Sequence, residues 1–180
     1  MKKILLFIAT FFIFTSTLFA SPAIDITKMS ISDIQDAVDK GLINYEQLTQ
    51  LYLDRIDEYS DTYNSISYVN EDAISIAKEL DLEYVKSGRR SMLYGIPVIV
   101  KDNIDVLGFP TTASSRALKD NYPTSDALII KRLKEAGAII IAKGRMSEFA
   151  FSATESYNSY GNVYNAYDVT QLEHQVLLLI

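Results

Sequence analysis

The sequence has no cysteine and only one histidine, His174, among its 180 residues. The absence of cysteine excludes disulfides, thiolate catalysis and cysteine-ligated metal sites. A histidine-based metal site or a Ser-His-Asp triad has little to build on, because there is no second histidine. We therefore expect no bound metal and no cofactor, and any hydrolytic chemistry must use a base other than histidine.

Positive charge is also scarce, since 17 lysines and arginines stand against 23 aspartates and glutamates and the formal net charge is -6. Proteins that bind nucleic acid usually carry a basic patch or stripe that contacts the phosphates, and the sequence shows no such stripe. We therefore expect no nucleic-acid partner.

Long apolar runs are missing except in the first twenty residues. Lys2 and Lys3 precede the apolar stretch Ile4–Phe14, and small or polar residues lead to Ala20. This pattern is typical of a secretory signal peptide over residues 1–20, and the stretch is shorter than the ~20 apolar residues of a membrane-spanning helix. An uncleaved anchor is the alternative. Cleavage would give an exported chain, periplasmic or secreted, without a stable membrane anchor, and the loss of two lysines would change the net charge from -6 to -8.

The rest of the chain alternates between helical periodicity and short β-branched runs. The expected helices begin near Ile31, at Asn44, at Asn70 and at Ser125 or Asp126, and they end at Gly41, near Tyr59, at Gly88 and at Gly137. The expected strands are Ser65–Val69, Ile96–Val100 and Ala138–Ala142. Because one helix lies between the last two strands, we expect a right-handed crossover in a mostly parallel or mixed sheet. No repeat or linker is visible, which favours a single α/β domain.

A lysine, Lys101, follows directly after the apolar run Ile96–Val100. Its stem could pack at the strand end while its amine reaches water or pairs with Asp102 or Asp105. Alternatively, Lys101 lies at the carboxyl end of a strand, where α/β sheets bind ligands. A lysine desolvated there loses proton affinity and can act as a neutral base toward a serine hydroxyl. The pattern alone leaves both interpretations open.

Several ordered motifs resemble the amino-terminal part of the amidase signature family. They read GIPVIVKDNIDVLGFPTTASSRAL from Gly95, DALIIKRLKEAGAIIIAKGRMSEFA from Asp126, and NAYD after a glycine. The first contains the family's Gly, Pro, apolar strand, Lys-Asp-Asn and Gly-x-Pro-Thr-Thr elements, and the second includes Lys143, followed by Met146 and Glu148. We therefore expect residues 21–168 to form the amino-terminal part of an amidase domain.

The resemblance implies a hydrolase of small amides that uses a Ser, cis-Ser and Lys triad. Lys101 matches the family's lysine base, which takes a proton from a nucleophilic serine through a bridging serine. Asp102 and Asn103 are expected to organise the turn through side-chain hydrogen bonds. The implied fold is the amino-terminal portion of the amidase-signature fold, a mixed sheet covered by helices that is incomplete in this chain.

The sequence departs from the family pattern in three places. It has Ala142–Met146 where the family usually has Gly-Lys-Thr-Asn-Met, and Asn165-Ala166 where the family usually has Asn-Pro. After Asp168 the family continues into a Gly/Ser-rich loop that supplies the bridging serine, whereas residues 169–180 form a non-family tail. Both triad serines are therefore missing, and we expect these residues to be inactive alone. A shifted reading frame from Leu172 can encode Arg-Thr-Pro-Gly-Ala-Ser-Ser, so we expect a truncated or frameshifted gene.

Other functions remain open at the level of sequence. The chain could be a non-catalytic exported module that binds a partner through its helices or its sheet edge. Within the family it could resemble the transamidating subunit that makes glutaminyl-tRNA, against which the signal peptide argues. Ser114 or Ser115 could be recruited as a nucleophile for Lys101, or they could be turn residues. An open sheet edge and uncovered apolar faces predict poor solubility, and the oligomeric state is left open.

Overall fold

The computed structural model describes residues 24–152 and 157–170. The expected signal peptide, residues 1–20, and most of the expected tail, residues 171–180 with His174, lie outside the described residues. No helix within the described ranges is long and apolar enough to cross a membrane.

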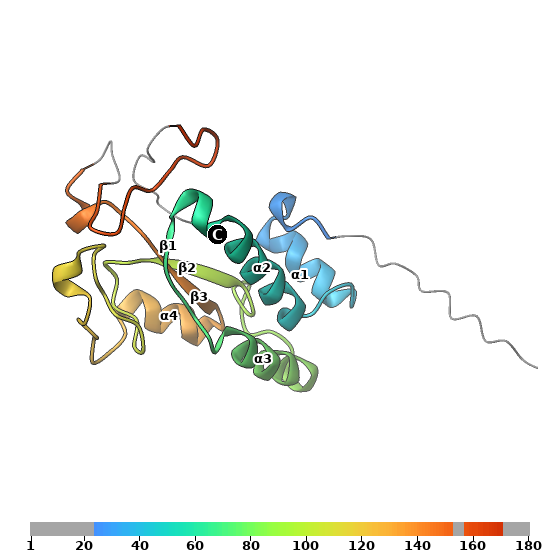
Figure 1. The fold of residues 1–180 in the computed structure, drawn as a ribbon. Helices are drawn as coiled ribbons and strands as arrows, with labels where there is room; N and C mark the ends of the chain where they lie inside the picture. The colour runs from blue at the N-terminus through green and yellow to red at the C-terminus, as the bar shows by residue number, and fades with distance from the viewer. Residues whose placement is uncertain (1–23, 153–156, 171–180) are drawn as a thin grey trace, which may run out of the picture.

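Two helices come first, and from the second of them helices and strands alternate along the described part of the chain, as the periodicity predicts (Figure 1). The α-helices are α1 (Ile31–Asp39), α2 (Tyr45–Tyr63), α3 (Ala73–Ser87) and α4 (Leu128–Ala136). The strands are β1 (Ile66–Val69), β2 (Pro97–Lys101) and β3 (Ile139–Gly144). Three short 3-10 turns lie at Ile26–Lys28, Arg116–Leu118 and Glu148–Ala150.

The three strands form one mixed sheet in the order β1-β3-β2. The central strand β3 runs parallel to β2, to which α4 connects it, and antiparallel to β1. The expected α/β fold with a mixed sheet is therefore confirmed.

The pairing of β2 with β3 contains a bulge. Val98 lies opposite Ile140, but the next residue of β2, Ile99, lies opposite Ala142, so that Ile141 is an extra residue in β3. A bulge of this kind changes which side chains of the two strands share a face of the sheet beyond that point.

Helices cover both faces of the sheet and divide the core into two clusters (Figure 1). Buried side chains of α1, α2 and α3, such as Leu48 and Leu80, pack against Ile141 on one face. On the other face, Ile130 of α4 packs against Val100 of β2. The sheet thus separates a three-helix side from an α4 side.

The start of α2 is fixed by the capping box that the sequence predicts. The Asn44 side chain accepts a hydrogen bond from the Gln47 amide at 2.7 Å, and the Gln47 side chain accepts one from the Asn44 amide at 3.1 Å. The helix continues one turn beyond the expected end near Tyr59. It stops at Tyr63, where Asn64 adopts the left-handed conformation (φ 49°), which asparagine tolerates better than most residues.

The predicted cap at Asn70 is wrong. Helix α3 begins after Asp72, and Asn70 uses its side chain to tie the end of β1 to the central strand. Its amide group donates to the Ile140 carbonyl at 2.7 Å, and its carbonyl oxygen accepts from the Asp72 amide at 3.0 Å.

The predicted start of α4 at Ser125 or Asp126 is also wrong, because the helix begins at Leu128. The Asp126 carboxylate instead accepts a hydrogen bond from the Leu107 amide at 2.7 Å and pairs with Lys134 at 2.9 Å. Asp126 therefore connects the loop after β2 to the helix, without capping its first turn.

Close packing fixes the point at which the chain enters β2. Gly95 has a φ of 70°, and a Cβ atom there would lie 2.0 Å from the Tyr45 ring. The buried Gln35 side chain donates hydrogen bonds to the carbonyls of Met92 and Tyr94 at 2.9 and 2.8 Å. It also accepts a hydrogen bond from the Tyr45 hydroxyl at 2.9 Å. These contacts hold the strand that ends at Lys101.

Candidate active site

Lys101 is the last residue of β2 and lies opposite Gly144, the last residue of β3. It therefore stands at the carboxyl end of a parallel strand pair, the edge where α/β sheets bind ligands. The side chain is partly buried. Among residues 24–152 and 157–170 it has no hydrogen-bond or ion-pair partner, so the alternative in which it pairs with Asp102 or Asp105 is not found.

The Lys101 side chain is on the three-helix face of the sheet. Successive side chains of a strand point to opposite faces. Val100 packs in the α4 cluster, whereas Ile99 packs against the cluster of α1, α2 and α3. Lys101, two residues after Ile99, shares the face of Ile99.

The next residue, Asp102, is buried and organises the loop that follows β2. Its carboxylate accepts hydrogen bonds from the Thr112 hydroxyl and from the amides of Thr112 at 3.4 Å and Ser114 at 3.1 Å. Its own amide donates to the Gly144 carbonyl at 2.9 Å. The prediction that Asp102 organises the turn is confirmed. Asn103 is exposed, and within the described ranges its side chain forms no such bond.

A second lysine, Lys143, is completely buried next to this carboxylate. Its Nζ lies 3.6 Å from Asp102 Oδ1 and donates to the carbonyls of Ile104 at 2.8 Å and Pro110 at 3.4 Å. Burial lowers the pKa of Lys143, and the Asp102 carboxylate opposes that shift. Lys143 lies opposite Val100, so it is on the α4 face. The sequence marks Lys143 as part of a motif but gives no sign of this contact.

Ser114 and Ser115 are both buried, and their hydroxyls take part in the loop structure. Ser114 Oγ accepts a hydrogen bond from the Met146 amide at 2.9 Å, and Ser115 Oγ accepts one from the Ala117 amide at 3.3 Å. Ala113 and Ser114 have φ values of 47° and 55°, a strained backbone conformation for residues other than glycine. This geometry favours the interpretation of both serines as turn residues.

Glu148 links the same loop to the segment after β3. The Ser159 hydroxyl donates to its carboxylate at 2.8 Å, and hydrogen bonds from Ser115 and then Ser159 lower the pKa of Glu148. The following residue, Phe149, has a φ of 54° and donates its amide to the Ala113 carbonyl at 3.0 Å. Two segments with strained backbone, one at Ala113 and one at Phe149, are therefore hydrogen-bonded to each other beside the carboxyl end of the sheet.

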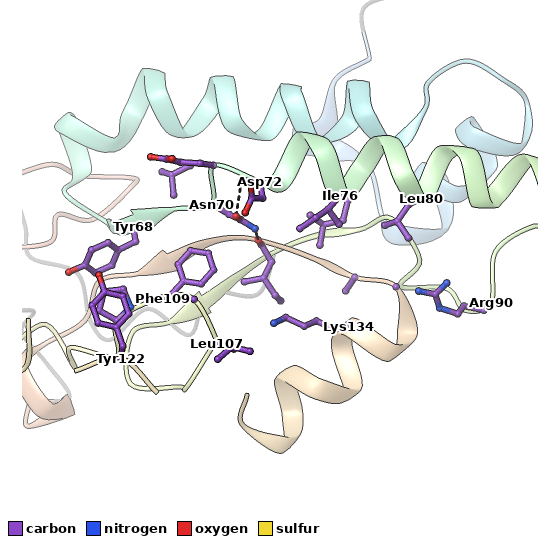
Figure 2. Close-up of a pocket in the computed structure, with 18 residues that line it drawn as sticks. Tyr68, Asn70, Asp72, Ile76, Leu80, Arg90, Leu107, Phe109, Tyr122 and Lys134 are labelled. Atoms are coloured by element: carbon purple, nitrogen blue, oxygen red, sulfur yellow. Dashed lines mark hydrogen bonds between the residues drawn. The ribbon is translucent and has the colours of Figure 1, made fainter. Parts of the chain in front are cut away.

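In the part of the chain that the structure describes, a larger and a smaller hollow border the sheet, and the residues lining them do not include Lys101. The larger, about 640 Å³, runs along the edge strand β1 and the start of β3, between α3 and α4. Figure 2 shows Tyr68, Phe109 and Tyr122 gathered at one end of it and Arg90 at the other. The smaller, about 420 Å³, is lined by α2 tyrosines and by Ile99, so it lies on the Lys101 face of the sheet.

The arrangement provides one lysine amine at the carboxyl end of the parallel strand pair and a second lysine buried in an ion pair. A lysine of the first kind can accept a proton when neutral. The described residues hold no group of three or more His, Cys, Asp or Glu side chains that could bind a metal ion.

Comparison with known sequences identifies relatives of this chain. A sequence profile of the family described as Amidase matches residues 47–172. The glutamyl-tRNA(Gln) amidotransferase A subunit from Lawsonia intracellularis is 39% identical over 141 residues, 78% of this chain and 29% of that protein. The protein of the same name from Salinispora tropica is 32% identical over 149 residues, 82% of this chain and 30% of that protein. The chain thus spans about 30% of the length of these relatives.

Solved structures show the same similarity. The native peptide amidase from Stenotrophomonas maltophilia superimposes with a TM-score of 0.75 and 31% identity, over 79% of this chain and 31% of that one. An amidase family protein from Bacillus anthracis gives a TM-score of 0.66 and 37% identity, over 74% of this chain and 26% of that one. Profile, sequence and fold confirm the resemblance that the motifs indicate, and the chain belongs to the amidase signature family.

Proposed function

We propose that this chain contributes the lysine base of an amide hydrolase, and that the base is Lys101. The observation that carries the proposal is the position of Lys101, partly buried and unpaired within the described ranges at the carboxyl end of β2, in a member of a family of amidases. As a neutral amine it would take the proton of a serine hydroxyl as that hydroxyl attacks the amide carbon.

Hydrolysis by this route needs serines that the described loop does not offer. The hydroxyls of Ser114 and Ser115 are already engaged by the amides of Met146 and Ala117, and the family's Gly/Ser-rich loop is not among these 180 residues. We propose that Lys101 serves serines in the remaining portion of an amidase domain, and that these 180 residues alone do not hydrolyse amides.

A chimera tests the role of Lys101. Residues 24–168 would replace the matching segment of the Stenotrophomonas maltophilia peptide amidase, and release of ammonia from a peptide amide would be measured. We expect an active chimera that loses at least about a thousandfold in kcat on Lys101→Met, because removal of a base and its contacts costs at least that much in a concerted triad. Lys86→Met, at an exposed position of α3, is the matched control. A Lys101→Met chimera with unchanged kcat would refute the proposal.

The 180-residue chain can be tested with a fluorophosphonate, which labels activated serines. We expect no labelling, because neither buried serine hydroxyl is free. Labelling that disappears on Ser114→Ala or Ser115→Ala would instead support a dyad of that serine with Lys101.

A second function is favoured by the names of the curated relatives, several of which are A subunits of glutamyl-tRNA(Gln) amidotransferase at 31 to 39% identity. On this proposal the chain would be part of such an amidotransferase. A chimera with the Lawsonia intracellularis protein would be assayed for amidation of glutamyl-tRNA(Gln) and for hydrolysis of a peptide amide. Activity confined to the tRNA substrate would favour the amidotransferase. We give preference to the hydrolase because the leader pattern in residues 1–20 leads us to propose an exported protein.

A further inference from the structure

Lys143 is a buried charged residue to which the proposed reaction assigns no task. Lysine is almost never fully buried unless it is paired, and its ammonium group has three N–H donors. Those donors face three oxygen atoms, namely the carbonyls of Ile104 and Pro110 and the carboxylate of Asp102. The amine is therefore fully surrounded by acceptors.

All three acceptors belong to one stretch of chain, the loop that begins immediately after Lys101. Asp102 extends the network further, since it accepts hydrogen bonds from Thr112 and Ser114. A single ammonium group on the central strand thus holds the loop over residues 102–114 against the end of the sheet.

The same network fixes the orientation of the peptide group that joins Lys101 to Asp102. The Asp102 amide donates to the Gly144 carbonyl at 2.9 Å, while the Asp102 side chain is held on the α4 face by Lys143. Asp102 follows the last residue of β2, and its amide extends the pairing with β3 by one residue. Because successive side chains of an extended chain point to opposite faces, a fixed position for Asp102 on the α4 face favours one direction for the Lys101 side chain on the other face.

We propose that Lys143 is a positioning residue for Lys101, acting through Asp102 and the loop that both residues hold. This inference rests on the proposed role of Lys101 as the base. A buried ion pair is often no more stabilising than an apolar pair of similar volume, so stability alone does not account for a charge here. Three loop oxygens converging on one point do require a group with several donors.

Other ionisable groups act on this pair from the surrounding elements. Asp105, from the same loop, favours the charged form of Lys143. Asp102 in turn interacts with Arg145, beyond the end of β3, and with Tyr68 of β1. Substitutions at Lys143 and Asp102 leave these three groups unchanged, so that any effect can be assigned to the charges of the pair.

The test measures the reactivity of Lys101 in the chain as purified from its host. Acetylation by limiting acetic anhydride would be followed over about pH 6 to 11, around the ordinary range of lysine, by mass spectrometry of the peptide that contains Lys101. Amide hydrogen exchange at Thr112 and Ser114 would be measured in parallel. Neither readout depends on amide hydrolysis.

Lys143→Met is the principal variant. It leaves the Asp102 carboxylate without its cationic partner, which favours the protonated form of a neighbouring amine. We expect the midpoint of the Lys101 acetylation profile to rise by at least about half a pH unit and the two amides to exchange at least about tenfold faster. Ile130→Ala, which removes α4 packing without touching the pair, controls for general loss of stability.

Shifts in Lys143→Met no larger than those in Ile130→Ala would overturn the inference. If Lys143→Met does not fold, the double variant Asp102→Asn/Lys143→Met removes both charges and decides the matter: we expect faster exchange at Ser114, and full protection in this folded variant would overturn the inference. The proposed function is tested separately, because only the activity of the Lys101→Met chimera can refute it. The acetylation and hydrogen-exchange results bear on the role of Lys143 alone.

Discussion

The Nζ atom of Lys143 lies 3.6 Å from Oδ1 of Asp102, and both side chains are completely shielded from solvent. Removal of one member of such a pair leaves an uncompensated buried charge, whereas removal of both does not. The pair therefore gives a sharp prediction for stability, in addition to its proposed effect on Lys101.

We expect Lys143→Met to lower the free energy of unfolding by about 3–5 kcal/mol, and Asp102→Asn/Lys143→Met to lower it by less. Urea denaturation would measure both. Lys134→Met breaks the more exposed ion pair with Asp126 and should cost no more than about 1 kcal/mol. A single variant as stable as the double variant would contradict the prediction.

Gly95→Ala should destabilise the chain more than Gly88→Ala, although both glycines have φ near +70°. Each substitution places a side chain in a sparsely populated backbone region and costs about 1–3 kcal/mol. At Gly88 an added Cβ meets no atom within 4 Å, whereas at Gly95 it would lie 2.0 Å from the Tyr45 ring, which adds overpacking of about 1–3 kcal/mol. Thermal unfolding of the two variants checks this difference. Equal losses would show that the Tyr45 ring moves aside freely.

Glu148 should contribute stability that depends on pH. Hydrogen bonds from Ser115 and Ser159 lower its pKa below the ordinary 4.5. A carboxyl group whose pKa is lowered by folding stabilises the native state above its unfolded pKa, and this contribution is lost as the pH falls through the folded pKa. We therefore expect the melting temperature to fall less steeply below about pH 4.5 in Glu148→Gln than in the unmodified chain.

Glu79→Gln, at an exposed position of α3, is the control for loss of a surface carboxylate. The comparison uses melting temperatures measured at several values between about pH 3 and 6. Identical acid slopes for Glu148→Gln and Glu79→Gln would show that the bonds from Ser115 and Ser159 do not favour the ionised carboxylate.

Export should remove the first twenty residues. We expect a chain expressed with its own leader in a bacterial host to be recovered outside the cytoplasm, with Ser21 as its first residue. Amino-terminal sequencing would establish the start. Recovery from the cytoplasm with Met1 intact would count against export and remove the main argument against an amidotransferase.

Uncovered apolar side chains should cause self-association. Leu107, Leu128 and Ile129 are exposed, and Leu107 also lines the hollow beside β1. We expect the sedimentation coefficient to rise with protein concentration, and Ile129→Lys to reduce that rise. Thr62→Lys adds the same charge at an exposed polar residue of α2 and serves as the control. A monomer with a cooperative thermal melt would contradict the expected poor solubility.

Most of the fold could be predicted because its signals are local. The capping box joins Asn44 to Gln47, only three positions apart, and apolar periodicity marks all four helices of the described part. Asn70 and Asp126 also have side chains that could cap a helix. In the structure they form hydrogen bonds with distant groups instead, Asn70 with the carbonyl of Ile140 and Asp126 with the amide of Leu107. Such competition between local and long-range partners cannot be read from spacing.

The residues of the candidate site also differ in whether local or long-range signals determine them. Lys101 stands out because a charge follows an apolar run, a feature visible over six residues. The burial of Lys143 depends on Asp102, which is 41 positions earlier in the chain, and on the extra residue in β3. The positive φ of Ser114 is likewise associated with a long-range contact, the hydrogen bond from the Met146 amide. The sequence has no glycine at this position that would predict such a backbone conformation.

The bulge in β3 determines how the two lysines are distributed. In an unbroken register Lys143 would lie directly opposite Lys101, four positions beyond the pairing of Pro97 with Ile139. Two ammonium groups would then be neighbours on one face, at the ~5 Å spacing of adjacent strands. Because Ile141 is an extra residue in β3, the Lys143 side chain lies on the opposite face of the sheet from Lys101. There it pairs with the Asp102 carboxylate. A one-residue irregularity thus separates two like charges, one of which is paired with a buried carboxylate while the other, Lys101, has no ion-pair partner among the described residues.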